Sequence, residues 1–123
     1  MFTMIDATLI AKIRTASRLM VRELGFMSTT LAATDYSPSA VHTLVEIENR
    51  SAMTAAQLVQ VLGLEKSSVS RLLGKLIRIG ELREMVSETD ARVKQIQLTA
   101  QGKETVARIN AYANMRVLDA ITP

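Results

Sequence analysis

One stretch of the sequence gathers side chains that could bind a polyanion. Residues 66 to 79 read KSSVSRLLGKLIRI, in which the polar side chains are basic or carry a hydroxyl and none is acidic. Lys and Arg bind phosphates and guanine edges, and short hydroxyls contact phosphates or bases at close range. The pattern predicts contact with the major groove of duplex DNA, although a basic, serine-rich surface can also serve solubility alone. The residues concerned are Lys66, Ser67, Ser68, Ser70, Arg71 and Lys75, with Arg78 as a further cation.

The sequence offers no comparable set for catalysis. It contains no cysteine, which excludes disulfides, thiolate metal ligands and cysteine nucleophiles. The single histidine, His42, precedes Glu46 by four residues, a spacing that could orient an imidazole, but no nucleophile or cluster of metal ligands accompanies the pair. We therefore expect no enzyme activity, metal site or cofactor within these residues.

The length and the charge balance set broad limits. A chain of 123 residues predicts one domain, and 15 Lys and Arg against 12 Asp and Glu give a net charge of only +3, so the placement of charge matters more than its total. Charges such as Lys12 and Arg14 interrupt the longest apolar runs. We expect neither a membrane span nor a secretory signal, and we place the protein in the cytoplasm.

The acid-free stretch belongs to a pair of predicted helices. Thr54 and Gln57 have the spacing of a capping box that starts a helix over 55–62, which ends at Gly63. Apolar residues recur at helical spacing over 66–79, and Gly80 ends that helix. Two helices joined by a tight glycine turn predict a helix-turn-helix. A helix over 38–49 precedes them, with Ser37 as its N-cap.

The flanking segments complete the expected fold. Strands over 82–86 and 93–98, joined by a loop, predict a wing, and amphipathic helices are expected over 5–25 and 100–121. The last helix carries an apolar seam from Val106 to Ala120, which we expect to pack along the first helix and against a second chain. The predicted class is mainly α with a small β-hairpin, a winged helix-turn-helix flanked by N- and C-terminal dimerisation helices.

Two segments carry a resemblance to a known family. The first reads LGLEKSSVSRLLGKLIRIGEL and resembles the turn and recognition helix of the multiple antibiotic resistance regulator (MarR) family of winged-helix transcription factors. The second reads DARVKQIQLTAQGKE and resembles that family's wing and following helix, including its Asp-x-Arg pair and its Leu-Thr-x-x-Gly signature. Because the order of elements agrees as well, the resemblance covers nearly the whole chain.

The resemblance implies a role for the wing. Asp90 would hold the wing tip and orient Arg92, which would enter the minor groove, while Lys94 would lie on the adjoining phosphates. Without the resemblance, the Asp90 and Arg92 pair reads as an ordinary ion pair in a turn. The resemblance also implies major-groove contacts by the recognition helix and phosphate contacts by two further cations. These residues are Lys66, Ser67, Ser68, Ser70 and Arg71 for the major groove, and Arg78 and Arg83 for phosphates.

The resemblance further implies partners. A family member acts as a homodimer through its terminal helices and reads a palindrome with two recognition helices about 34 to 36 Å apart. Such regulators often bind a small-molecule effector between the dimer helices and the winged lobe. The corresponding crevice here would be lined by Arg18, Arg22, Tyr36 and His42, although core packing also accounts for Tyr36 and a surface position for His42.

A second interpretation concerns a larger protein. The segments RTASRLMVRELGFM and YSPSAVHTLVEI resemble the N-terminal part of proteins in which such a regulator is fused to a GNAT-type acetyltransferase. The sequence ends at Pro123, where the family usually continues into another dimerisation helix, so we expect a longer chain. The alternative function is therefore a regulatory or dimerisation domain of an acetyltransferase lying C-terminal to these residues, with any acetyl transfer outside them.

Overall fold

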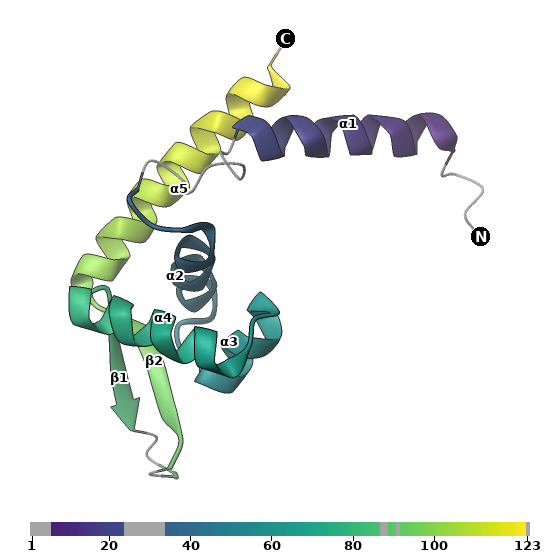
Figure 1. Cartoon of the computed structure of the whole chain (residues 1–123). Helices are drawn as coiled ribbons and strands as arrows, with labels where there is room; N and C mark the ends of the chain where they lie inside the picture. The colour runs from purple at the N-terminus through teal and green to yellow at the C-terminus, as the bar shows by residue number, and fades with distance from the viewer. Residues whose placement is uncertain (1–5, 24–33, 87–88, 91, 123) are drawn as a thin grey trace.

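The computed structural model describes residues 6–23, 34–86, 89–90 and 92–122. This part of the chain forms five helices and one antiparallel hairpin (Figure 1). In chain order the elements are α1 (Ala7–Glu23), α2 (Pro38–Arg50), α3 (Ala55–Leu62), α4 (Lys66–Ile79), β1 (Leu82–Val86), β2 (Lys94–Leu98) and α5 (Ala100–Ile121). The predicted class, a mainly helical winged helix-turn-helix between two outer helices, is confirmed.

The helix boundaries follow from caps written in the local sequence. The Ser37 side chain accepts a hydrogen bond from the Ala40 amide and starts α2. At α3 the Thr54 hydroxyl accepts from the Gln57 amide at 3.1 Å, and the Gln57 side chain accepts from the Thr54 amide at 2.9 Å. This reciprocal pair is the predicted capping box. Gly80, with φ of 98°, ends α4 in a backbone conformation that glycine adopts without strain.

The hydrophobic core lies where α2, α3, α4 and the hairpin meet the first half of α5. Met53, between α2 and α3, pairs with Ile96 through two backbone hydrogen bonds of 3.0 and 2.7 Å, and so extends the sheet beyond β2. Val106 and Ile109 bring α5 into the same core. Other core residues without measurable exposure are Leu44, Ile47, Leu58 and Leu76.

A buried glutamate ties the end of α4 to the start of α5. The Glu81 side chain is 1% exposed, and its Oε1 accepts hydrogen bonds from Gln101 Nε2 at 2.8 Å and from Thr105 Oγ1 at 3.0 Å. The Glu81 carbonyl accepts from the Thr99 amide at 3.1 Å. A side chain at Gly102 would collide with that carbonyl, which explains a glycine in the first turn of α5. The orientation of α4 relative to α5 is therefore fixed by specific contacts.

The first helix stands apart from this core. The C-terminal end of α1 meets the C-terminal half of α5, and the rest of α1 points away from the described chain, so the two helices cross and do not pack along one another as the sequence predicts (Figure 1). The apolar side chains Leu9, Ile10 and Ile13 remain 42, 49 and 56% exposed. The first residues of the apolar seam of α5, Val106 and Ile109, are buried against the winged lobe, the unit formed by α2, α3, α4 and the hairpin, and not against α1. No described helix is long and apolar enough to cross a membrane.

Candidate nucleic-acid interface

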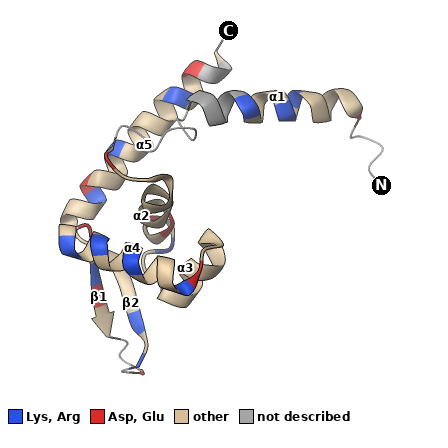
Figure 2. Ribbon diagram, viewed as in Figure 1, with Lys and Arg blue, Asp and Glu red and all other residues tan. Residues whose placement is uncertain are grey.

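The acid-free surface of α4 faces outward. Val69, Leu73 and Leu76 point into the core, which turns the remaining positions of the helix toward solvent. Figure 2 shows cations spaced along this helix and on the hairpin beside it. The predicted contact residues Lys66, Ser67, Ser70, Arg71, Lys75 and Arg78 are all exposed, and Ser68 is half-buried. In the single chain, these side chains are therefore accessible to a binding partner.

The polar positions of α4 divide between two sides of the helix. Lys66 and Ser70 lie on the side that faces α3 and the hairpin, where both line a groove. Arg71, Lys75 and Arg78 follow one another at intervals of four and three residues, so they form a separate line of cations. The sequence predicts one surface for these residues, whereas the fold divides them between two adjoining surfaces of α4.

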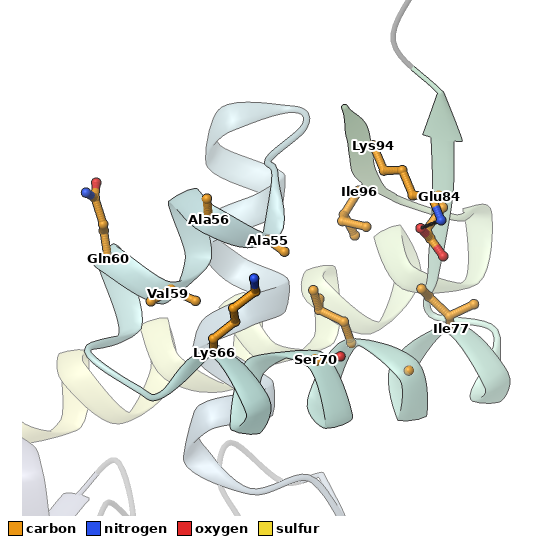
Figure 3. Close-up of a pocket in the computed structure, with 12 residues that line it drawn as sticks. Ala55, Ala56, Val59, Gln60, Lys66, Ser70, Ile77, Glu84, Lys94 and Ile96 are labelled. Carbon is orange, nitrogen blue, oxygen red and sulfur yellow. Dashed lines mark ion pairs between the residues drawn. The ribbon is translucent and has the colours of Figure 1, made fainter. Parts of the chain in front are cut away.

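The groove is a hollow of about 660 Å³ bounded by α3, α4 and the hairpin. Apolar and small side chains form most of its wall, among them Ala55, Val59, Leu73 and Ile96. Polar side chains line it from every side (Figure 3). They are Gln60 on α3, Lys66 and Ser70 on α4, and Glu84 and Lys94 on the hairpin. α4 thus lies beside the hairpin, and the groove between them is lined by two cations, Lys66 and Lys94.

The described part of the wing tip is organised by Asp90. Its Oδ1 accepts hydrogen bonds from the Arg92 amide at 3.0 Å and from the Arg92 guanidinium at 3.3 Å. The Asp90 carbonyl accepts from the Val93 amide at 3.0 Å. The Arg92 side chain nevertheless remains 91% exposed. The aspartate therefore orients a guanidinium that is exposed to solvent.

Arg83 lies on the other face of the hairpin. Successive residues of a strand point to opposite faces, and its neighbour Glu84 lines the groove. The Arg83 guanidinium donates to Gln97 Oε1 at 3.2 Å, and both residues line a second hollow together with Lys103. Arg83 therefore lies apart from the groove and from the exposed side of α4. A phosphate contact by this residue would involve a different part of the duplex.

The residues predicted to line an effector crevice lie on different elements. Arg18 is exposed on α1, His42 is exposed on α2, and the Arg22 side chain lies outside the described residues. Tyr36 precedes α2 and packs against the core. Burial raises the pKa of Tyr36 above 10.0, and hydrogen bonding to Glu81 adds to the rise. Among the three whose side chains are described, Arg18, Tyr36 and His42, none lines the groove or the second hollow, so the crevice stays a prediction.

Glu84 belongs to the site, although the sequence patterns do not single it out. Among the described residues that line the groove, it is the one acid. The alternation of the strand could have placed it, because Leu82 and Glu84 share a face and Leu82 is buried. In the same described part of the chain, no three His, Cys, Asp or Glu side chains gather into a candidate metal site.

Comparisons with known proteins agree with this geometry. Residues 34–93 match the model of the MarR family, which spans α2 through the start of the wing. No curated protein matches the sequence at a significant level. Many solved structures share the fold, at low sequence identity.

Three of these structures illustrate the likeness. RV1404 from Mycobacterium tuberculosis superposes with a TM-score of 0.74 at 21% identity, covering 97% of this chain and 84% of that chain. Wild-type MarR from E. coli, in its apo form, gives 0.66 at 17% identity, with coverage of 96% and 86%. BpsR from Bordetella bronchiseptica, whose DNA binding is regulated by 6-hydroxynicotinic acid, gives 0.65 at 15% identity, with coverage of 92% and 83%. At these identities the likeness establishes the fold.

Proposed function

We propose that this chain is a DNA-binding transcription regulator of the MarR family, whose model matches residues 34–93, and that it acts as a dimer reading one palindromic DNA site. The observation that carries the proposal is the outward, acid-free surface of α4 with a projecting arginine at the wing tip beside it. Within the family the DNA-binding role is general. For this chain we propose that role itself, together with the contact residues, the palindrome and the dimer.

Each surface of the lobe has a part in the proposed complex. α4 would enter the major groove, where Ser67 and Arg71 would meet base edges and phosphates. Lys66 and Lys94 would bind the DNA strand that passes between α4 and the hairpin. Arg92 would enter the minor groove, where negative potential favours a guanidinium. Its contact with Asp90 supports this role. The aspartate already restricts the orientations of the exposed arginine, so the arginine loses less conformational entropy on binding.

The outer helices supply the proposed dimer interface. Leu9, Ile10 and Ile13 on α1 and Met115 and Leu118 on α5 leave apolar surface in water within a single chain. A second copy would bury it, and burial of apolar surface is worth about 25 cal/mol per Å². A twofold axis through these helices would present two α4 helices to successive turns of the duplex, and this geometry requires a palindromic site.

Regulation by a small molecule is a further part of the proposal. A ligand held between the outer helices and the winged lobe would change the spacing of the two α4 helices. Arg18, Arg22, Tyr36 and His42 are the residues that we assign to such a crevice. The support is analogy with BpsR, whose DNA binding responds to 6-hydroxynicotinic acid.

The acetyltransferase alternative has less support. It rests on two segments of sequence likeness, and the family model and the three structures compared above add no acetyltransferase. The recognition surface is also complete in the winged lobe, which an exclusively dimerising domain would not require. We therefore favour the DNA-binding regulator, acting in the cytoplasm.

The proposal is tested by duplex binding over a range of salt concentrations. The logarithm of the wild-type binding constant should fall by about 0.9 per logarithmic unit of salt for each phosphate contacted. Arg71→Ala and Arg92→Ala should each weaken binding by about tenfold to a hundredfold, since charge-assisted contacts contribute about 1.5 to 3 kcal/mol. Lys103→Ala is the matched control, because Lys103 is an exposed cation of α5 that lines the second hollow and not the groove.

The result that contradicts the proposal is equally specific. If Arg71→Ala and Arg92→Ala bind duplex as tightly as the Lys103→Ala control, the assigned surface does not meet DNA. Loss of binding in all three variants alike would indicate attraction by overall charge without a defined interface.

A further inference from the structure

The groove between α4 and the hairpin contains an acid at the place where a DNA strand is proposed to pass. Glu84 and Lys94 lie diagonally across the two strands, since Glu84 pairs in register with Ile96 and Lys94 with Val86. The Glu84 Oε2 atom is 3.5 Å from Lys94 Nζ, and the two side chains are 44 and 63% exposed. Figure 3 shows the pair on the wall of the groove facing α4.

This position is unfavourable for a carboxylate if a phosphate strand enters the groove. A second cation, Lys66, lines the groove from α4, and no other acid lines it among the described residues. Removing Glu84 would leave a groove whose only charges are positive. Neither the packing of the core nor a helix cap needs the Glu84 side chain, which is exposed in the middle of β1. Its one ion-pair partner in this part of the structure is Lys94.

We propose that Glu84 limits the affinity for DNA by competing with phosphate for the Lys94 ammonium. The inference rests on the proposed DNA-binding function and names a regulator of its strength. In the free protein the carboxylate takes the place of a phosphate oxygen beside Lys94. DNA binding must exchange this ion pair for a phosphate contact, so Lys94 adds little net affinity.

The competition acts on phosphate contacts, which do not depend on sequence. Base contacts made by α4 lie on another surface and are not changed. Glu84 therefore weakens binding to every duplex by a similar factor and keeps the chain from remaining on unrelated DNA, where phosphate contacts supply nearly all of the affinity.

The test is a double-mutant cycle with Glu84→Gln, Lys94→Met and the double variant. Each variant is titrated with one fixed duplex at several salt concentrations, after its unfolding curve has been compared with that of the wild type. Glu84→Gln should tighten binding by about two- to fivefold near 0.15 M salt, as expected for the loss of an exposed ion pair. The salt dependence should steepen by up to about 0.9, because Lys94 then neutralises a phosphate without giving up an ion pair.

Two comparisons identify Lys94 as the group through which Glu84 acts. In the Lys94→Met background, Glu84→Gln should leave the affinity within a factor of about 1.5. Glu48→Gln is the matched control, since Glu48 lines the second hollow with Arg83 and Lys103, on the face of the hairpin turned away from the groove. It should leave the affinity unchanged, because salt screens charges more than about 8 Å apart.

Three results would overturn the inference. Unchanged affinity in Glu84→Gln shows that no competition exists. Weaker binding shows that the carboxylate itself contacts DNA, for example by accepting from a cytosine amino group. Tightening of equal size in the Lys94→Met background shows direct repulsion of phosphates without Lys94. These outcomes leave the proposed function standing, whereas failure of the wild type to bind any duplex removes both.

Discussion

The same substitution at two glycines should change the stability of the fold in opposite directions. Gly102→Ala places a methyl group against the Glu81 carbonyl, a backbone atom that cannot rotate away. Gly74→Ala places one 3.4 Å from the end of the Arg78 side chain, which is exposed and can move. Both glycines are helical, so the comparison isolates the space around each Cβ.

The magnitudes follow from these surroundings. An alanine in an open helical position stabilises by about 0.5 to 1 kcal/mol relative to glycine, which is the expected gain at position 74. At position 102, overpacking costs about 1 to 3 kcal/mol. Any shift that relieves it stretches the 3.1 Å hydrogen bond from the Thr99 amide to the Glu81 carbonyl. We therefore expect Gly102→Ala to lower the free energy of unfolding by about 1 to 3 kcal/mol.

Urea unfolding followed by circular dichroism measures both changes. The chain concentration must be the same for all variants, since dimerisation makes apparent stability depend on it. With a slope of about 1 to 3 kcal/mol per molar urea, the two midpoints should lie on opposite sides of the wild type and differ by about 0.5 M or more. Equal midpoints, or a more stable Gly102→Ala variant, would refute the close packing of α5 against the turn after α4.

Three other predictions concern the buried carboxylate, its tyrosine neighbour and the outer helix. Glu81→Ala should lower the free energy of unfolding by about 2 to 4 kcal/mol, because it leaves the buried donors of Gln101 and Thr105 without their acceptor. Glu104→Ala, at an exposed position, should stay within about 0.5 kcal/mol of the wild type in the same assay, and equal effects would contradict the buried network. The raised pKa of Tyr36 means that the fold favours the neutral phenol. Its contribution to the free energy of unfolding is complete below pH 10.0 and is lost as the pH rises through the higher pKa of the folded protein. Unfolding between about pH 9 and 11 should show the wild type losing stability relative to Tyr36→Phe, and a constant difference would contradict this. Ile13→Glu should weaken the proposed dimer by about tenfold or more in sedimentation velocity, and an unchanged dimer would place the interface elsewhere.

The sequence predicted most of the fold because the relevant signals are local. The capping box of Thr54 and Gln57 and the glycine at position 80 act over one turn of helix, so their effects can be read without tertiary information. The hairpin was recognised for a similar reason. Its second strand begins at Lys94, one residue later than predicted.

The arrangement of the site depended on contacts between distant residues. Glu84 joins the groove only because the register of the hairpin sets it across from Lys94 and the core turns that face toward α4. Arg83, one residue earlier, is turned away by the same register. The direction of α1 was also unpredictable, because Leu9, Ile10 and Ile13 remain exposed and so do not fix its angle.

Selection of bound duplexes from a random pool tests the central claim most directly. If the exposed surface of α4 reads DNA, one palindromic sequence should be enriched, with half-site centres separated by about one helical turn or 34 to 36 Å. Enrichment should be lost in Arg71→Ala, while Lys103→Ala should select the same sequence as the wild type. A pool that returns no preferred sequence would contradict the claim that this chain is a sequence-specific regulator.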